Sequence, residues 1–128
     1  MHIAMTAFEI NLECINAYLC SDSYALTPWS HDDINMLELL YRRFLHLLAS
    51  HPTVPLAPSA CIDEYWHAHI LHTRRYIDDC NNIAGRYIHH EPADSRNPDR
   101  ESLKVAFQNT CDLYEQTFGE PLVIFKDD

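Results

Sequence analysis

Apolar side chains recur every three or four positions along most of this chain, instead of alternating with polar ones. Because an α-helix turns once in about 3.6 residues, this spacing places the apolar side chains on one face of a helix. The longest such run contains Ile34, Leu37, Leu40, Tyr41, Phe44, Leu45 and Leu48. Only two glycines, Gly85 and Gly119, interrupt the chain. The pattern predicts an all-α protein.

The pattern predicts two helices before residue 51. The first is expected over about Ala7 to Cys20, and the second ends at about Ser50. Ser30 lies three positions before Asp33, which is the spacing of a capping box with Asp in place of the usual Glu. Ser30 is therefore expected to cap the second helix. The buried face of the first helix is expected to contain Phe8, Leu12, Ile15 and Leu19.

A cluster of prolines separates the second helix from the third. Pro52, Pro55 and Pro58 fix their own backbone and push each preceding residue out of helical space, so we expect an extended connection. Ser59 can then cap the third helix. The apolar spacing predicts that this helix continues as one element to about Asn82.

Glycines mark the ends of the third and last helices. Gly85 can adopt the left-handed turn that ends the third helix, and a short aromatic segment from Arg86 to Pro92 follows it. Asp99 is expected to open a last helix that runs to about Phe118. Gly119 then provides the C-terminal cap.

These elements together predict a compact bundle of four main helices, with a histidine-containing segment after the third. A short apolar tail at residues 122–125 is expected to pack back on the bundle. Hydrophobic residues make up 47% of the chain, which is enough for one buried core. Residues 1–128 are therefore expected to form a single all-α domain.

The chain is strongly acidic, with nineteen Asp and Glu against nine Lys and Arg and a formal net charge of −10. Phosphate backbones and anionic membranes are bound by Lys and Arg, so neither nucleic acid nor a membrane is expected as a partner. No apolar run reaches the roughly 18 residues of a spanning helix. The N-terminus also lacks the basic start and long apolar run of a signal peptide. We therefore expect a cytoplasmic protein.

The five cysteines form an odd set without a C-x-x-C pair. Neither a zinc ribbon nor a complete disulfide framework is therefore indicated. In a reducing compartment most of these cysteines are expected to be reduced thiols of the core.

Histidine is the residue type that points to chemistry. The chain has nine histidines, and five of them fall within twenty-four residues: His67, His69, His72, His89 and His90. Three lie in the third predicted helix, and two follow Gly85. Imidazole at this density indicates a metal site or proton-transfer chemistry.

A helical wheel divides the histidines of the third predicted helix. One stripe, expected to face the core, contains Ile62, Trp66, His69, Thr73, Ile77 and Cys80. Asp63 and His67 are four positions apart on one flank, the spacing by which a helix presents two ligands to one ion. Residues two positions apart differ by about 200°. His67 and His69 therefore cannot easily bind the same ion on a regular helix.

Two sets of ligands follow from this wheel. In the first, Asp63 and His67 are joined by His89 or His90, which gives two histidines and one carboxylate and suits non-haem iron, manganese or zinc. In the second, His69 and His72 converge with His89 or His90, and this all-nitrogen set suits zinc or copper. Tyr76 would lie near the second set as a polar or redox partner. Because His89 and His90 are adjacent, only one of them is expected to be a ligand.

The residues around the histidines also resemble a known family. The resemblance lies in residues 63–71 with their Trp-His-x-His core, Tyr76, Asp79-Cys80, Gly85-Arg86-Tyr87 and His89-His90. These residues are similar to the core motif of glycine-rich domain-containing protein-like sequences, a family of domains in plant and fungal multidomain proteins and of small free-standing bacterial proteins. The late Thr110-Cys111-Asp112-Leu113-Tyr114 and Phe118-Gly119 resemble the bacterial members.

The resemblance covers about Pro52 to Gly119, although this chain has no glycine-rich region. The family's name supplies neither a reaction nor a cofactor. The resemblance implies that the motif positions are Asp63, Trp66, His67, His69, Tyr76 and His90.

The leading hypothesis is a small metal-binding protein that acts as a metal-dependent enzyme, oxidising or hydrolysing a small molecule or peptide. The cofactor is expected to be a divalent transition metal: iron, copper or zinc. The candidate metal ligands are Asp63, His67, His69 and His90, with Tyr76 as a candidate catalytic residue. One alternative is a non-catalytic interaction module with a structural histidine network and a partner protein. A third is a metal-independent acid–base enzyme that uses Asp63 and His67.

Overall fold

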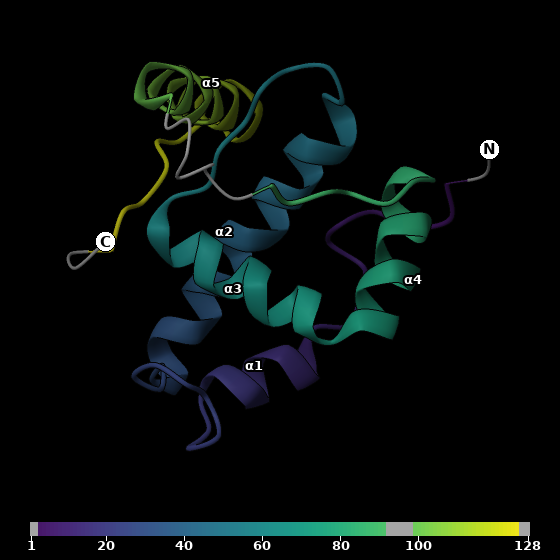
Figure 1. Ribbon diagram of the computed structural model, residues 1–128, viewed down its shortest axis with the longest axis vertical. Coiled ribbons are helices and arrows are strands. Elements are labelled where there is room, and N and C mark those ends of the chain that lie inside the picture. Colours follow the sequence, from purple (N-terminus) through teal and green to yellow (C-terminus); the bar gives the residue numbers. More distant parts are fainter. Residues whose placement is uncertain (1–2, 92–98, 126–128) are drawn as a thin grey trace.

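The computed structural model describes residues 3–91 and 99–125, and those ranges contain five helices and no strand (Figure 1). The all-α prediction is therefore confirmed. The helices are α1 Glu13–Leu19, α2 His31–Ser50, α3 Ala60–Leu71, α4 Thr73–Ala84 and α5 Arg100–Phe118. The predicted stop at Pro92 lies outside the described residues.

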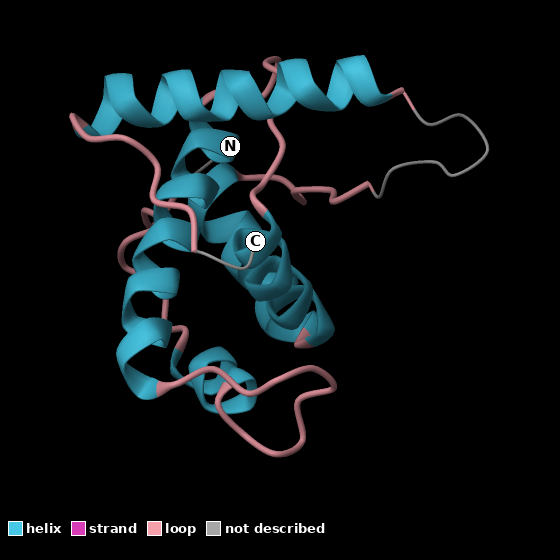
Figure 2. Ribbon diagram, turned by 90° about the vertical axis from the view of Figure 1, so that its left-hand side faces the viewer, coloured by secondary structure: helices cyan, strands magenta, loops and turns pink. Residues whose placement is uncertain are grey.

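Helix α2 runs through the centre of the molecule and contacts each of the other four helices (Figure 1). Its apolar stripe forms much of the core, where Leu37, Tyr41 and Phe44 are fully buried. Helix α5 lies across one end of the molecule (Figure 2) and contacts α2 alone among the described helices. The apolar tail also packs back as expected, because Phe125 lies edge-on to the ring of Trp29.

The predicted helix caps are confirmed. Ser30 accepts a hydrogen bond from the amide of Asp33 at 3.1 Å, and Asp99 caps α5 by accepting from the amide of Ser102. Each bond satisfies an amide that has no partner within its helix. Gly85 and Gly119 end α4 and α5 with φ values of 69° and 74°, a left-handed conformation that is strained for residues with a Cβ atom.

The first helix is shorter than the predicted range of Ala7 to Cys20, since α1 begins only at Glu13. The guanidinium group of Arg42 on α2 explains the difference. It donates to the carbonyl oxygens of Ala7 and Ile10, at 3.0 and 2.8 Å, and these bonds hold residues 7–10 in turns that pack on α2. The prediction that Phe8 lies on the buried face is wrong, because this side chain is 43% exposed.

The prediction of one continuous helix from Ser59 to Asn82 is also wrong, and residues 3–91 and 99–125 form five helices where four main helices were predicted. The break is at His72, whose φ and ψ of −84° and 69° are not helical. The Nδ1 atom of its ring donates to the carbonyl oxygen of Ala68 at 2.8 Å, which is the acceptor that the His72 amide would use in a continuous helix. Helix α4 therefore takes a new direction (Figure 1). Thr73 and Ile77 leave the predicted buried stripe and are exposed.

Cysteine burial and helix length bear on two other predictions. Cys61 and Cys80 lie in the core, as expected for apolar thiols, whereas Cys14, Cys20 and Cys111 are only half-buried. None of the described helices combines the length and the apolar character that crossing a membrane requires.

Candidate metal centre

Helix α3 presents Asp63 and His67 one turn apart on a face that is open to solvent. Ser59 begins this helix by accepting a hydrogen bond from the amide of Ile62. The Nδ1 atom of His67 lies 3.6 Å from Oδ2 of Asp63, and the two side chains are 57% and 36% exposed. The predicted pairing at a spacing of four residues is therefore present. Both side chains keep a large part of their surface free for a ligand.

The segment that follows Gly85 brings His90 to the same place. Ile88 anchors this segment, because its side chain is buried and its carbonyl oxygen accepts a hydrogen bond from the hydroxyl of Tyr76. The Nε2 atom of His90 then lies 2.6 Å from Oδ1 of Asp63. An ionised carboxylate can only accept, so the ring donates its Nε2 proton to Asp63. The side chain of His90 is 11% exposed, which makes it the most buried of these three residues.

Trp66 forms the surface on which His90 rests. The two rings are stacked with their centroids 3.9 Å apart and their planes inclined by 7°. The indole nitrogen donates to the hydroxyl of Tyr76 at 2.9 Å, and the edge of the indole packs against Phe44. A ring fixed by a hydrogen bond and by core packing in this way determines the plane of the histidine stacked on it. Trp66 thus positions His90 by stacking on its ring, and Tyr76 positions it through the hydrogen bond that anchors Ile88.

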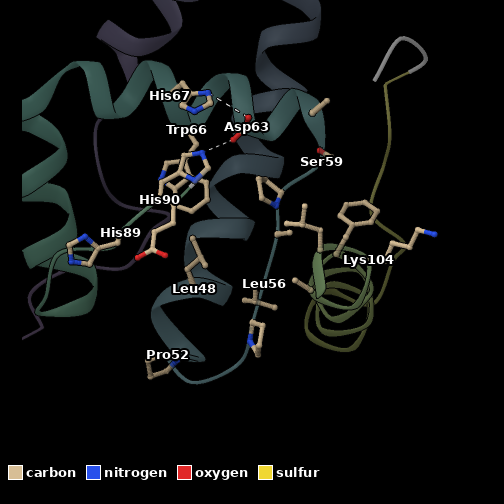
Figure 3. Close-up of a pocket in the computed structure, with 18 residues that line it drawn as sticks. Leu48, Pro52, Leu56, Ser59, Asp63, Trp66, His67, His89, His90 and Lys104 are labelled. Atoms are coloured by element: carbon tan, nitrogen blue, oxygen red, sulfur yellow. Dashed lines mark hydrogen bonds and ion pairs between the residues drawn. The ribbon is translucent and has the colours of Figure 1, made fainter. Parts of the chain in front are cut away.

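Asp63, His67 and His90 together form what we call the Asp–His–His cluster (Figure 3). One ligand atom from each residue lies within 4.8 Å of the other two. Ligand atoms around an ion with bonds of about 2.0–2.2 Å lie roughly 3–3.5 Å apart. The 3.6 Å separation of His67 and Asp63 is slightly above this range, and the 2.6 Å hydrogen bond of His90 is below it. These residues can hold an ion if His90 loses its Nε2 proton and the pair separates slightly.

The cluster lies at one end of a surface groove of about 910 Å³ (Figure 3). This groove is bounded by the proline segment at residues 52–59, by the first turns of α3, by residues 89–91, by α5 and by Leu48 of α2. Its volume is within the range of about 300–1,000 Å³ found for small-molecule sites. A ligand in the groove would therefore reach the three candidate metal ligands directly.

His69 lies in the core instead of joining this cluster. Its Nε2 atom is 2.8 Å from a carboxylate oxygen of Asp79, and its Nδ1 atom is 2.7 Å from the hydroxyl of Tyr41. Its side chain is 1% exposed, so both ring nitrogens are occupied in a place that solvent does not reach. We call Tyr41, His69 and Asp79 the His69 network. Asp79 was part of the family resemblance but was not among the candidate site residues, although a buried imidazole requires partners for both nitrogens.

The other residues singled out from the sequence lie outside the cluster. Tyr76 is 1% exposed, and burial raises the pKa of its phenol well above the ordinary value, so it remains a neutral donor to Ile88. His72 donates to Ala68 at the break between α3 and α4. His89 is exposed on the groove, with its ring packed against Tyr87. Of the two predicted ligand sets, the structure brings together the first, with His90 as its third member.

Comparison with known proteins identifies a family and two relatives. A family model described as UCP032817-like matches residues 23–118. The chain is 30% identical over 83 residues to glycine-rich domain-containing protein 2 of Arabidopsis thaliana, and 31% identical over 83 residues to glycine-rich domain-containing protein 1 of the same plant. Each alignment covers 62% of this chain but only 10% of the relative. No solved structure matches the chain.

These matches confirm the family resemblance inferred from the sequence. The matched region, residues 23–118, includes the whole Asp–His–His cluster and the groove beside it. Because the chain spans about a tenth of the length of each plant relative, most of each relative has no counterpart here. Neither relative's name specifies a ligand or a reaction.

Proposed function

The chain belongs to the UCP032817-like family, and from its Asp–His–His cluster we propose that it is a metal-binding protein whose ion acts on a ligand in the adjoining groove. One observation carries the proposal: ligand atoms of Asp63, His67 and His90 lie within 4.8 Å of one another at the end of a groove of about 910 Å³. Two histidines and one carboxylate leave further coordination positions open.

The donor set narrows the choice of ion. Two imidazoles with a carboxylate suit iron(II), manganese(II) or zinc(II), whereas copper is better matched by an all-nitrogen set. Such an ion would polarise a carbonyl oxygen or lower the pKa of a bound water, which would serve the hydrolysis or oxidation of a small molecule or peptide. Asp63 and His90 would hold the ion in place of the proton that now lies between them, and Trp66 would keep the His90 ring in its plane.

Metal analysis of protein purified without a histidine tag tests this proposal. We expect about one ion per chain after equilibration with zinc, iron(II) or manganese(II) and removal of the excess. His67→Ala, His90→Ala and Asp63→Asn should each lower the affinity at least ten-fold. His89→Ala is the matched control, because it removes an imidazole from the adjacent position, outside the cluster, and should retain the ion. Protein that takes up none of the three ions would refute the proposal.

Cobalt(II) offers a second measurement, because its visible absorption reports the ligands directly. We expect a spectrum in wild-type protein and in His89→Ala that is absent in His90→Ala. The stacking of Trp66 on His90 predicts that cobalt also quenches tryptophan fluorescence in the same two proteins. Circular dichroism of each variant without metal separates loss of the ion from loss of the fold.

A second candidate function is a non-catalytic interaction module whose histidines form a structural network. The 2.6 Å hydrogen bond from His90 to Asp63 and the stacking on Trp66 favour it, since both are contacts between side chains that can hold this part of the fold together. For this candidate, His90→Ala should destabilise the fold equally with and without added metal. Substitutions on the surface, and not those in the cluster, should then abolish the binding of a partner protein.

A further inference from the structure

The groove beside the Asp–His–His cluster has a wall that is held in place by hydrogen bonds. On α5, Asn109 donates to the carbonyl oxygen of Pro55 at 3.0 Å, and Thr110 donates to that of Ala57 at 2.8 Å. The amide of Ala57 donates back to the hydroxyl of Thr110 at 3.0 Å. These backbone groups of the proline segment are thus paired with α5. The segment is fixed before any ligand arrives, which lowers the entropic cost of binding.

The remaining surface of the groove is mostly hydrophobic away from the cluster. Apolar side chains from three parts of the chain line it: Leu48, Leu56, Pro58, Leu103 and Phe107. Next to His90 in the chain, Glu91 adds a second carboxylate to that of Asp63 in the lining. Lys104 is the sole Lys or Arg in the lining formed by residues 3–91 and 99–125, and Figure 3 shows its side chain on α5 directed away from the cluster. Among the described residues, the lining near the cluster therefore offers no Lys or Arg to an anionic group, and the carboxylates of Asp63 and Glu91 would offset the charge of a divalent ion held there.

We propose that the groove binds an uncharged substrate with a hydrophobic body, whose polar group lies at the Asp–His–His cluster. The inference names a substrate class for the function proposed above and rests on that function. Carboxylate and phosphate ligands are normally bound by Arg or Lys, and here they would meet Asp63 and Glu91 on a chain with a net charge of −10. The hydrophobic lining is matched instead by an alkyl or aryl group.

Nile red, an uncharged dye that fluoresces in apolar surroundings, is the first probe. We expect it to bind the wild-type protein at one site and to be displaced by 1-decanol at a concentration at least ten-fold lower than by decanoate. Straight-chain alcohols should displace it with an affinity that rises about four-fold for each added methylene until the groove is filled. Decanoate that competes as well as decanol would overturn the assignment to uncharged substrates.

Two substitutions on α5 form a matched pair. Leu103 lines the groove and is 44% exposed, while Val105 is 55% exposed on the same helix and is not part of the lining. Both sites are accessible to water, so Leu103→Glu and Val105→Glu should both fold. Leu103→Glu should weaken Nile red binding at least ten-fold, whereas Val105→Glu should leave it unchanged. Equal affinity in the two variants would show that the dye binds elsewhere and would overturn the proposal.

Metal content distinguishes failure of this inference from failure of the metal proposal. Leu103→Glu should lose the dye and keep the ion. Wild-type protein that binds the ion but no dye would refute the substrate class alone. Sedimentation equilibrium completes the test: a dimer that Leu103→Glu dissociates would assign the groove to a second copy of the chain and overturn the substrate proposal.

Discussion

Helix α3 carries two histidines, two positions apart, that belong to opposite kinds of polar network. His69 is 1% exposed, and both of its ring nitrogens lie within hydrogen-bonding distance of groups in the core. His67 is 57% exposed, and one ring nitrogen faces Asp63 at 3.6 Å. Both histidines lie near a carboxylate. The two networks differ in whether any lone pair of the histidine remains available to a ligand in the folded protein.

We call the His69 network closed because both ring nitrogens of His69 have a hydrogen-bond partner within the network. We call the Asp–His–His cluster open because its ligand atoms face the groove. An ionised Asp79 can only accept, so Nε2 of His69 donates to it and Nδ1 accepts the hydroxyl proton of Tyr41. Burial raises the pKa of Tyr41 well above its ordinary value, which keeps that hydroxyl protonated. No lone pair of His69 remains for an ion. The Asp–His–His cluster is half-exposed and faces a groove, so its lone pairs remain accessible.

The largest expected effect is therefore the loss of stability in His69→Ala. The substitution leaves the hydroxyl of Tyr41 and the carboxylate of Asp79 buried without their partner. The free energy of unfolding, measured by urea denaturation, should fall by about 3 kcal/mol. His67→Ala, on the same helix but exposed, should change it by less than about 0.5 kcal/mol. Equal losses in the two variants would contradict the division into a closed and an open network.

The next largest effect is stabilisation by metal, which should depend on the Asp–His–His cluster alone. At a free zinc concentration one hundred times its Kd, the wild-type protein should gain about 2.7 kcal/mol. For a chain of this size, that gain corresponds to a rise in Tm of roughly 10 °C. Tyr41→Phe alters the His69 network and should gain as much as wild type. His90→Ala should gain nothing. The opposite result in these two variants would place the ion in the core network.

Tyr76→Phe should have a smaller effect on stability and on zinc binding, because Tyr76 contacts the Asp–His–His cluster only through Trp66 and Ile88. Its hydroxyl accepts from Trp66 and donates to Ile88. Removing it should lower the free energy of unfolding by about 1–2 kcal/mol, and the loosened His90 segment should bind zinc less tightly. Tyr87→Phe is the control, since Tyr87 is 40% exposed and should change stability by less than about 0.5 kcal/mol. Unchanged zinc affinity in Tyr76→Phe would show that Trp66 alone positions His90.

Features set by local chemistry could be predicted from the sequence. Ser30 and Asp99 cap helices, and Gly85 ends one, because each acts on backbone groups within a few residues of itself. The inward direction of His69 and the pairing of Asp63 with His67 follow from the helical period, which also depends only on nearby positions.

Features set by distant contacts could not be predicted in the same way. The shortening of α1 depends on Arg42, which donates hydrogen bonds to two carbonyl oxygens in a segment more than thirty positions earlier. The choice of His90 over His89 depends on Trp66, whose ring provides a stacking surface across the gap between α3 and the segment after Gly85. The break at His72 depends on one side chain that replaces its own amide. The spacing of apolar residues along the chain could not predict these three contacts.

The smallest expected effect is the coupling between the two networks. His67 and Tyr41 belong to different networks, and among the described residues they share no hydrogen-bond, ion-pair or ring-contact partner. In metal-free buffer, the losses of stability in His67→Ala and Tyr41→Phe should therefore add in the double variant to within about 0.5 kcal/mol. A double-mutant cycle by urea denaturation measures this directly. A coupling of 1 kcal/mol or more, on the order expected for residues in one network, would mean that α3 transmits changes between core and groove.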